Sequence, residues 1–305
     1  MQATWRWRRW RLAGQYSLAV FVAALLALLL VRTCRDFEPV VDRAFLAASE
    51  PLVIAHRGAS LAATEHTMTA FEEALAAGAD VLELDLRLTG DGVPVIAHDR
   101  DLERALGVPL AIATTSLVDL RMAVAAAHPD RDPARVLLTF EDVLSRFDAA
   151  RLNVELKDNE TALALAVAEL VERAKAHDRV LVASFHSRVL RTFRDLVDGR
   201  VATSASVREA LAFYGCYQAR IPCRPAFEAL QIPPSVGSGL ISIDLTRRRF
   251  LEFARRHGLA VHIWTIDDAT ELRRLFSLGL DGVMTNDPEV AAAARDASMR
   301  DNHAN

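Results

Sequence analysis

The chain has 305 residues, of which 51% are hydrophobic and 25% are charged, and its formal net charge is −4. This length suits one large α/β domain with an appendage, or two small domains. The slightly acidic balance argues against a nucleic-acid-binding protein, which usually presents a basic face. Three cysteines are too few for a disulfide scaffold. Cys216 and Cys223 are close enough in sequence to bridge in an oxidising compartment, and a free pair is the alternative.

An uncharged apolar run at residues 12–31 lies near the start of the chain. A helix rises about 1.5 Å per residue, so this run would span about 30 Å, the thickness of one hydrocarbon core. The residues before it are Trp5, Trp7 and Trp10, which suit an interfacial belt, and Arg6, Arg8, Arg9 and Arg11. The positive-inside rule then places the N-terminus in the cytoplasm and the main domain outside it, in the periplasm or on the outer face of a bacterium.

We therefore predict that residues 1–35 form a cytoplasmic stub and a single-pass transmembrane anchor. A cleaved signal peptide is the alternative, although no small-x-small cleavage site follows Val31 directly. Residues 36–50 are predicted to be a linker, residues 51–297 the main domain, and residues 298–305 a tail.

Strand-like apolar segments alternate with amphipathic helical segments from Pro51 onward. Strands are predicted to begin near Leu52, Val81, Leu152, Val180, Val201, Ala229, Ala260 and Gly282. Helices are predicted over Thr67–Ala77, Thr161–Ala176, Ser187–Val197, Thr246–His257, Asp268–Ser277 and Pro288–Ala297. Eight such repeats over about 250 residues predict an α/β fold, a (β/α)8 TIM barrel. A doubly wound open sheet is the alternative, but its usual Gly-rich phosphate turn is replaced here by His56-Arg57-Gly58.

Three regions interrupt this alternation. Residues 87–98, with a turn at residues 90–92, predict a hairpin that extends the second strand. Residues 100–132 are irregular and are predicted to be a loop inserted over one end of the barrel. Residues 214–239 contain four prolines and two of the cysteines, and they predict a second loop insertion.

Ionisable residues stand on or directly after the predicted strands. They are His56, Arg57, Glu83, Asp85, His98, Glu155 and Lys157. Glu83 and Asp85 are two apart on one strand, so their side chains face the same way. The carboxyl ends of barrel strands share one rim, so we expect all seven side chains to lie there. Burying such charges costs several kcal/mol unless they meet one another, a metal or an anionic ligand.

The three carboxylates predict a metal site. Glu83, Asp85 and Glu155 would bind a hard divalent cation, Ca²⁺ or Mg²⁺, because oxygen ligands suit these ions. Arg57 and Lys157 would then hold the phosphoryl oxygens of a negatively charged substrate.

Imidazole titrates near neutral pH, so His56 and His98 would act as general base and general acid. Each of the seven residues also has a structural interpretation, such as a packed histidine or a Glu155–Lys157 ion pair. Seven ionisable residues on one rim are more than such interpretations explain together.

The same residues resemble the glycerophosphodiester phosphodiesterase family. The motifs that carry the resemblance are His56-Arg57-Gly58 with Glu65-His66-Thr67, Gly78 through Asp85, Thr89 through Gly92, His98-Asp99, Asn153 through Lys157, Val261 through Thr265, and Gly279 through Pro288. The resemblance covers about residues 51–295. It implies a metal-dependent enzyme on a (β/α)8 barrel that cleaves glycerophosphodiesters to glycerol 3-phosphate and an alcohol.

The resemblance also implies roles by matching position. His56 and His98 are the acid/base pair, Glu83, Asp85 and Glu155 the metal ligands, and Arg57 and Lys157 the phosphate contacts. Glu65 lines the loop after the first strand. Trp264 resembles a residue near the substrate, with packing at the barrel end as its alternative.

This sequence departs from the family pattern at a few positions. Thr64 and His66 replace the usual proline and asparagine, and Arg104 is followed by Ala-Leu where two threonines are common. These departures concern the choice of substrate. The predicted anchor suggests an alternative, a phospholipase-type activity on lysophospholipid or phospholipid headgroups. A non-catalytic envelope-binding module is the second alternative.

Overall fold

The computed structural model describes residues 43–238 and 241–303, so the predicted membrane segment at residues 12–31 lies outside the described residues. Within those two ranges, none of the helices combines the length and the apolar character that crossing a bilayer requires. The chain divides into two compact units. The described part of the first unit is residues 209–226, and the second unit comprises the remaining described residues.

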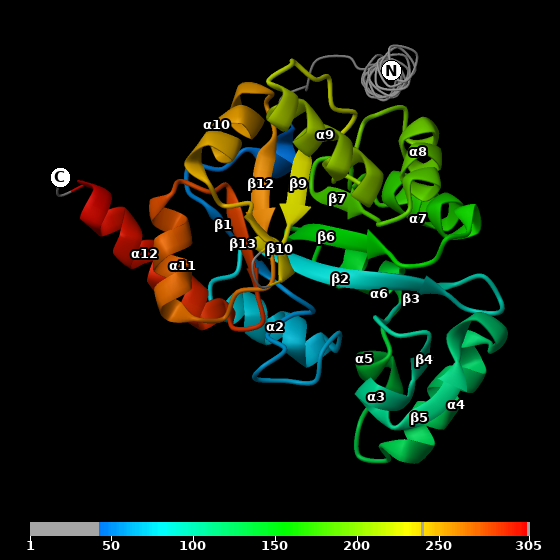
Figure 1. Ribbon diagram of the computed structural model, residues 1–305. Coiled ribbons are helices and arrows are strands. Elements are labelled where there is room, and N and C mark those ends of the chain that lie inside the picture. Colours follow the sequence, from blue (N-terminus) through cyan, green and yellow to red (C-terminus); the bar gives the residue numbers. More distant parts are fainter. Residues whose placement is uncertain (1–42, 239–240, 304–305) are drawn as a thin grey trace, which may run out of the picture. The chain divides into compact units, whose positions relative to one another are not determined.

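The second unit is built on eight parallel strands (Figure 1). They are β1 (Leu52–Ala55), β2 (Val81–Leu88), β6 (Arg151–Leu156), β7 (Val180–Ala183), β8 (Ala202–Thr203), β9 (Ala229–Ile232), β12 (Ala260–Ile263) and β13 (Gly282–Thr285). Their order around the sheet is β8-β7-β6-β2-β1-β13-β12-β9. A single bridge between Ser204 and Ala229 joins the two ends, with Ala205 N–H donating to Ala229 O at 2.9 Å. The strands therefore form a nearly closed barrel, as predicted, and not an open sheet.

Each barrel strand is followed in the chain by a helix. These helices are α2 (Met68–Ala76), α6 (Phe140–Arg146), α7 (Thr161–Arg173), α8 (Ser187–Leu196), α9 (Val207–Ala219), α10 (Arg248–Arg256), α11 (Ala269–Ser277) and α12 (Pro288–His303). α12 continues into the predicted tail. Side-chain caps begin several helices: the Thr67 hydroxyl accepts from Ala70 N–H, and Thr139 and Asp142 form a reciprocal capping box. The Thr67 cap explains why α2 begins where the sequence predicts, whereas α6 was not predicted from the sequence.

A residue from the predicted linker covers the interior of the barrel at the end where the strands begin. Phe45, in the 3-10 helix η1 (Ala44–Leu46), is fully buried against residues that begin the barrel strands, including Leu52 and Val81. Arg43 forms an ion pair with Glu228 at 3.1 Å. Arg43, Phe45 and Leu46 of the predicted linker are therefore packed against the barrel unit, whereas residues 47–50 are exposed.

Residues 101–138 form a small α/β subdomain, which corrects the prediction of an irregular loop. Its elements are β4 (Asp101–Leu102), α3 (Glu103–Leu106), β5 (Val108–Ala111), the 3-10 helix η2 (Ile112–Thr114), α4 (Leu117–Ala127) and α5 (Pro133–Val136). Leu102, Ile112 and Leu120 are buried in its own apolar cluster. The elements are too short for periodicity to reveal, and contacts between them stabilise the subdomain. The predicted hairpin is confirmed, because β3 (Pro94–Ile96) pairs antiparallel with β2.

The predicted loop insertion at residues 214–239 is partly wrong. Its first residues belong to α9, and its last residues belong to β9 and to β10 (Ser235–Ser238), which pairs antiparallel with β11 (Ile241–Asp244). Within the first unit, Cys216 and Cys223 form a disulfide. The sequence left two possibilities for these cysteines, a disulfide and a free pair, and the structure shows the disulfide.

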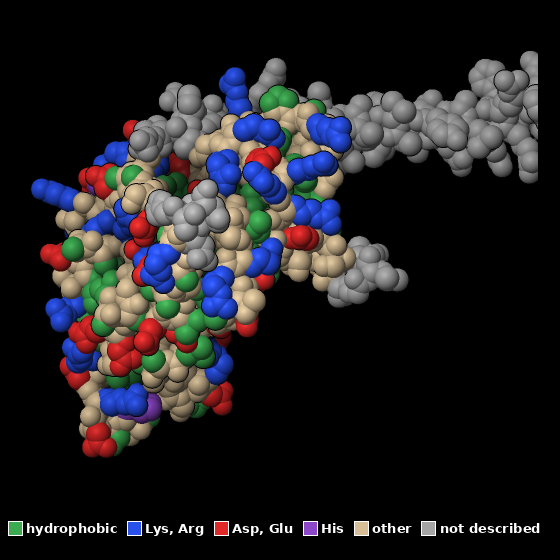
Figure 2. All heavy atoms as spheres, turned by 90° about the vertical axis from the view of Figure 1, so that its left-hand side faces the viewer, with side chains coloured by type: hydrophobic (Ala, Val, Ile, Leu, Met, Phe, Trp, Pro, Cys, Tyr) green, Lys and Arg blue, Asp and Glu red, His purple; other side chains and the backbone are tan. Residues whose placement is uncertain are grey.

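Arginines on the outer helices lie in exposed ion pairs. Arg248 pairs with Glu252 on α10, and Arg274 pairs with Glu271 on α11. Figure 2 shows this side of the molecule, where Lys and Arg side chains lie among Asp and Glu. These arginines lie on helix faces that are exposed to solvent.

Candidate active site

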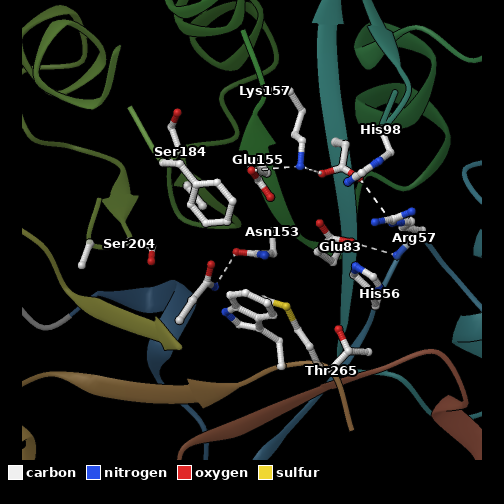
Figure 3. A pocket seen from close by; sticks show the side chains of 17 residues that line it. His56, Arg57, Glu83, His98, Asn153, Glu155, Lys157, Ser184, Ser204 and Thr265 are labelled. Carbon is white, nitrogen blue, oxygen red and sulfur yellow. Dashed lines mark hydrogen bonds and ion pairs between the residues drawn. The ribbon is translucent and has the colours of Figure 1, made fainter. Parts of the chain in front are cut away.

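A cavity of about 260 Å³ lies at the carboxyl ends of the barrel strands (Figure 3). Eight of the nine predicted site residues line it: His56, Arg57, Glu83, Asp85, His98, Glu155, Lys157 and Trp264. They come from β2, β6 and the loops after β1, β3, β6 and β12. The shared rim of parallel strands thus places residues up to 208 positions apart around one space.

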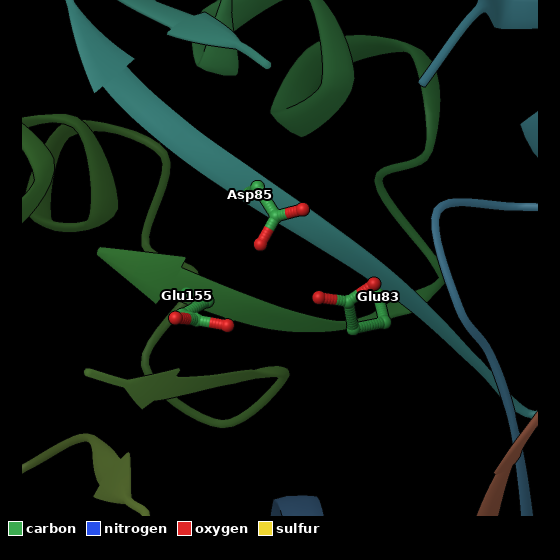
Figure 4. Close-up of side chains that lie close together, drawn as sticks. All are labelled: Glu83, Asp85 and Glu155. Carbon is green, nitrogen blue, oxygen red and sulfur yellow. The ribbon is translucent and has the colours of Figure 1, made fainter. Parts of the chain in front are cut away.

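Three of the residues that line this cavity are carboxylates that lie close together (Figure 4). One oxygen each from Glu83, Asp85 and Glu155 lies within 4.8 Å of the others. Glu83 and Asp85 are almost fully buried, and Asp85 Oδ2 has no hydrogen-bond partner in the described part of the chain. A buried set of oxygen donors with an unsatisfied atom fits a hard divalent cation.

The same crowding perturbs the carboxylates in opposite directions. Burial, followed by the charges of Asp85 and Glu155, raises the pKa of Glu83 well above its usual value. Burial and the charge of Asp85 also raise the pKa of Glu155. For Asp85, burial would raise the pKa, but the interactions with His66, Lys157 and Arg57 outweigh it, so its pKa is lowered. Without a cation the group therefore favours one ionised aspartate and two glutamates that resist ionisation.

Two cationic side chains border the carboxylates. Lys157 Nζ lies 3.1 Å from Glu155 Oε1 and 3.5 Å from Asp85 Oδ1, and Arg57 Nε lies 3.5 Å from Asp85 Oδ2. Once all three carboxylates are ionised they outnumber these two positive charges, so a further cation would balance the site and an anionic ligand could bind beside it.

A tight turn after β1 aims Arg57. Arg57 has φ of 60° and Gly58 has φ of 82°. A Cβ at Gly58 would lie 2.7 Å from the backbone of Ala70, so only glycine fits there. The turn directs Arg57 N–H to Glu83 Oε2 at 2.8 Å. The His-Arg-Gly motif thus holds the arginine beside the carboxylates.

His56 is fixed by residues at the opposite end of the chain. Its Nδ1 lies 2.7 Å from Asn286 Oδ1, and Asn286 Nδ2 donates to Asp267 Oδ2 at 2.8 Å. Because Asn286 presents its oxygen, His56 Nδ1 carries the proton and Nε2 is the acceptor. Burial lowers the pKa of His56, against the hydrogen bond to Asn286, which raises it. A neutral imidazole with an open Nε2 can accept a proton.

His98 is held at both its ring and its backbone. Its Nδ1 lies 2.8 Å from Asp99 Oδ1. Its carbonyl oxygen accepts from Arg87 Nε at 2.9 Å and Nη2 at 2.7 Å, and Arg87 is paired with Asp158 at 2.6 Å. The ring is therefore presented to the cavity with Nε2 available for proton transfer.

Glu65 is the predicted site residue that does not line the cavity. Its carboxylate pairs with Arg104 at 2.6 Å and with Arg57 at 3.3 Å. Burial would raise its pKa, but the hydrogen bond from Arg104 and the charges of His66 and Arg57 lower it. Glu65 thus lies outside the cavity and contacts Arg57 and Arg104.

Comparison with known proteins decides the family. The model of the glycerophosphoryl diester phosphodiesterase family matches residues 56–290. The chain belongs to this family. A probable glycerophosphodiester phosphodiesterase 2 of Mycobacterium tuberculosis is 31% identical over 256 residues, covering 79% of this chain and 89% of the relative. A human lysophospholipase D is 28% identical over 264 residues, covering 77% of this chain and 83% of the relative.

A solved structure supports the same conclusion. An Oleispira antarctica phosphodiesterase, determined in complex with the product sn-glycerol-3-phosphate, superposes with a TM-score of 0.65 at 25% identity. The match covers 81% of this chain and 97% of that protein. The prediction of a phosphoric diester hydrolase is thereby confirmed, and the alternative of a non-catalytic module loses its support.

Two aromatic rings stand at the side of the phosphodiesterase cavity. Phe185, directly after β7, is 52% exposed, and its ring centroid lies 6.5 Å from that of Trp264. Lys157 Nζ lies 5.8 Å from the centre of the Phe185 ring. Trp264 also packs against the apolar cluster of the barrel interior, which agrees with the packing interpretation, while its contact with the substrate stays a prediction. Together the rings give the cavity an apolar wall.

Sequence reasoning missed the residues that hold the two histidines. Asn286 binds His56 and is itself bound to Asp267, and Arg87, which is paired with Asp158, binds the backbone of His98. The available signals were the Asn-Asp-Pro block after the last strand and the aspartate directly after Lys157. Their sequence positions do not reveal which residues they contact.

The sequence also did not reveal what the side chain of His66 contacts. It is buried beneath Asp85, and its Nε2 accepts from Asp85 N–H at 3.3 Å. Burial lowers its pKa to about 4. The imidazole therefore acts here as a neutral acceptor that supports the backbone of Asp85.

Proposed function

We propose that the protein hydrolyses glycerophosphodiesters to glycerol 3-phosphate and an alcohol, with a divalent cation, Ca²⁺ or Mg²⁺, held by Glu83, Asp85 and Glu155. The observation that carries this proposal is the convergence of three buried carboxylates, two cations and two oriented histidines on one cavity. When bound, the cation would stabilise the charge that develops on the phosphoryl oxygens.

The side chains of this protein would carry the proton transfers. Arg57 and Lys157 hold phosphoryl oxygens of the substrate, Arg57 with its planar fork and Lys157 as a point charge. His56 Nε2 takes the proton of the glycerol 2-hydroxyl as that oxygen bonds to phosphorus. His98 Nε2 gives a proton to the oxygen of the leaving alcohol as its bond to phosphorus breaks.

The first half of the reaction leaves a cyclic glycerol phosphate, His56 protonated and His98 neutral. In the second half His98 takes a proton from water as the water oxygen bonds to phosphorus, and His56 returns its proton to the glycerol 2-oxygen as the bond between that oxygen and phosphorus breaks. Both histidines end in their starting states. Using the glycerol hydroxyl as an internal nucleophile exploits proximity.

The first expected result is metal-dependent release of glycerol 3-phosphate from glycerophosphocholine and glycerophosphoethanolamine. EDTA should abolish the release by the full chain, and adding back Ca²⁺ or Mg²⁺ should restore it, because the carboxylates repel one another and no longer orient the phosphate when the cation is absent. Coupled enzymatic detection of glycerol 3-phosphate measures both arms. Undiminished release in EDTA would contradict the metal site.

A second candidate function uses a lysolipid as substrate. The exposed ring of Phe185 beside Trp264 offers an apolar surface at the cavity, and a relative of this chain is named lysophospholipase D. Choline release from lysophosphatidylcholine and from glycerophosphocholine separates the two functions, because cleavage of the lysolipid leaves lysophosphatidate and not glycerol 3-phosphate. Product from the lysolipid alone would favour the second candidate, and product from the water-soluble diesters alone would exclude it.

We also propose that residues 12–31 anchor the protein in a membrane, with the catalytic unit on the extracytoplasmic side. The uncharged run and the preceding arginines support this orientation, and the Cys216–Cys223 disulfide suits an oxidising compartment. We expect alkaline phosphatase fused to the C-terminus to be active in a bacterial host, and a fusion without residues 12–31 to be inactive. Fluorescence from a C-terminal green fluorescent protein, together with an inactive phosphatase, would contradict this orientation.

A further inference from the structure

Two residues proposed to contact the substrate are connected by a continuous series of ion pairs outside the cavity. Arg57 Nη1 lies 3.3 Å from Glu65 Oε1, and Glu65 is bound in turn by Arg104. Arg104 also binds Asp99, whose other oxygen lies 2.8 Å from His98 Nδ1. Arg104 belongs to α3 of the inserted subdomain, so this subdomain is joined to both sides of the cavity.

The geometry at Arg104 uses the whole guanidinium fork. Nη1 and Nη2 donate to the two oxygens of Glu65 at 3.1 and 2.6 Å, and Nε donates to Asp99 Oδ2 at 2.5 Å. Three N–H groups of one planar cation thus fix two carboxylates at a set angle, which an ammonium group cannot do.

Each of the two carboxylates acts on a different part of the site. Asp99 accepts from His98 Nδ1, which keeps the proton on that nitrogen and turns Nε2 to the cavity. Glu65 holds the guanidinium of Arg57, which faces the phosphate position. Without Arg104, both carboxylates would lose their shared partner and would be free to rotate.

We propose that Arg104 is a positioning residue that sets the orientation of His98 through Asp99 and of Arg57 through Glu65. The proposal rests on the proposed phosphodiesterase function, and it gives the inserted subdomain a role in catalysis. Arg104 itself does not line the catalytic cavity. Its effect is transmitted through two ion pairs, and it should therefore appear in both kcat and KM.

The test compares Arg104→Ala and Arg104→Lys with the wild type, using glycerophosphocholine and saturating metal. Misplacing a catalytic group by about 1 Å costs up to about 100-fold in rate, so Arg104→Ala should lower kcat/KM about 10- to 100-fold. Asp99→Asn should lower mainly kcat, and Glu65→Gln should raise mainly KM. Arg104→Lys should recover part of the loss, because its single charge can satisfy one carboxylate at a time.

A combination of variants separates positioning from mere folding. In the Asp99→Asn and Glu65→Gln double variant, adding Arg104→Ala should cost less than twofold further, because its route to the site is already broken. At a pH where the His98 ring is neutral, the ¹⁵N signals of histidine-labelled protein should show its Nδ1–H tautomer in the wild type and the loss of this tautomer in Arg104→Ala, at an unchanged melting temperature.

Arg200→Ala is the matched control. The side chain of Arg200 is 49% exposed, against 52% for Arg104, and it pairs with Glu172 and His177 away from the cavity. This variant should keep the wild-type kcat and KM within about twofold. Arg104→Ala with wild-type kcat, KM and His98 signals would overturn the proposal. An inactive wild type would instead contradict the proposed function.

Discussion

His98→Ala should lose most of its activity on glycerophosphocholine but much less on a glycerophosphodiester whose leaving group is p-nitrophenol. General acid–base catalysis contributes about 10²- to 10⁴-fold, so the loss on the choline ester should fall in that range. An alkoxide must be protonated as it leaves, whereas p-nitrophenolate is stable as an anion. Removing the general acid therefore matters little for the second substrate.

His56→Ala should lose a similar factor on both substrates, because the base acts on the glycerol hydroxyl that the two substrates share. Release of choline and of p-nitrophenol in a single turnover at saturating metal measures the four values, because it follows the first half of the reaction alone, before His98 is needed to activate water. His177→Ala is the control, since this histidine pairs with Glu172 on the outer surface. Equal losses of activity on the two esters for His98→Ala would contradict its role as the general acid. A loss for His56→Ala that is larger on the choline ester would instead make His56 the acid and His98 the base.

The roles of the histidines follow from partners that the sequence did not reveal. The sequence predicted the positions of His56 and His98 because each follows a strand-like segment. It did not predict Asn286, which lies 230 positions from His56 and fixes its tautomer. Arg87 and Asp158 are 71 positions apart and likewise meet only in the folded protein. Supporting contacts of this kind depend on tertiary geometry, which spacing alone does not encode.

The barrel was predictable for the opposite reason. Its strands are short apolar segments, and its helices have their own caps and apolar faces. The residues within each element are therefore enough to predict it. The inserted subdomain lacks such local signals. Its two strands are two and four residues long, and residues such as Leu120 are buried only by contacts between its elements. Glu65 shows the same limit, because a correct motif position did not indicate that its carboxylate faces Arg57 and Arg104.

Glu83→Gln should abolish metal-dependent hydrolysis and, at the same time, stabilise the metal-free protein. Glu83 is buried beside Asp85 and Glu155, so burial and the two like charges raise its pKa well above the usual value. Its ionised form therefore opposes folding. Glutamine removes that charge and keeps an oxygen that can accept from Arg57 N–H, as Glu83 Oε2 does at 2.8 Å.

The pH dependence of the stability of the metal-free protein shows whether the charge on Glu83 stabilises or destabilises the fold. Between its unfolded and folded pKa values, the folded protein binds a proton at Glu83 that the unfolded chain has lost. The stability of the metal-free wild type should therefore fall as pH rises through the raised pKa of Glu83. Glu83→Gln should show a weaker fall, because this group no longer titrates.

Metal should reverse the order of stability. A cation at 100 times its Kd stabilises the wild type by about 2.7 kcal/mol, and Glu83→Gln should lose most of this gain because one ligand charge is missing. Thermal unfolding in EDTA and in saturating Ca²⁺ or Mg²⁺ measures both states, where each kcal/mol corresponds to about 2–4 °C in Tm. The variant should melt above the wild type in EDTA and below it with metal.

Glu228→Gln provides the matched control for this inversion. Glu228 is also buried, but Arg43 lies 3.1 Å from its carboxylate and Thr203 N–H donates to it at 2.8 Å. Removing its charge should therefore lower Tm in both conditions, because a buried ion pair loses one partner. If Glu83→Gln lowered Tm in EDTA as Glu228→Gln does, the carboxylates would not repel one another, and their close approach would not mark a cation site. The opposite signs expected for two buried glutamates separate a charge that holds the fold together from one that is kept for catalysis.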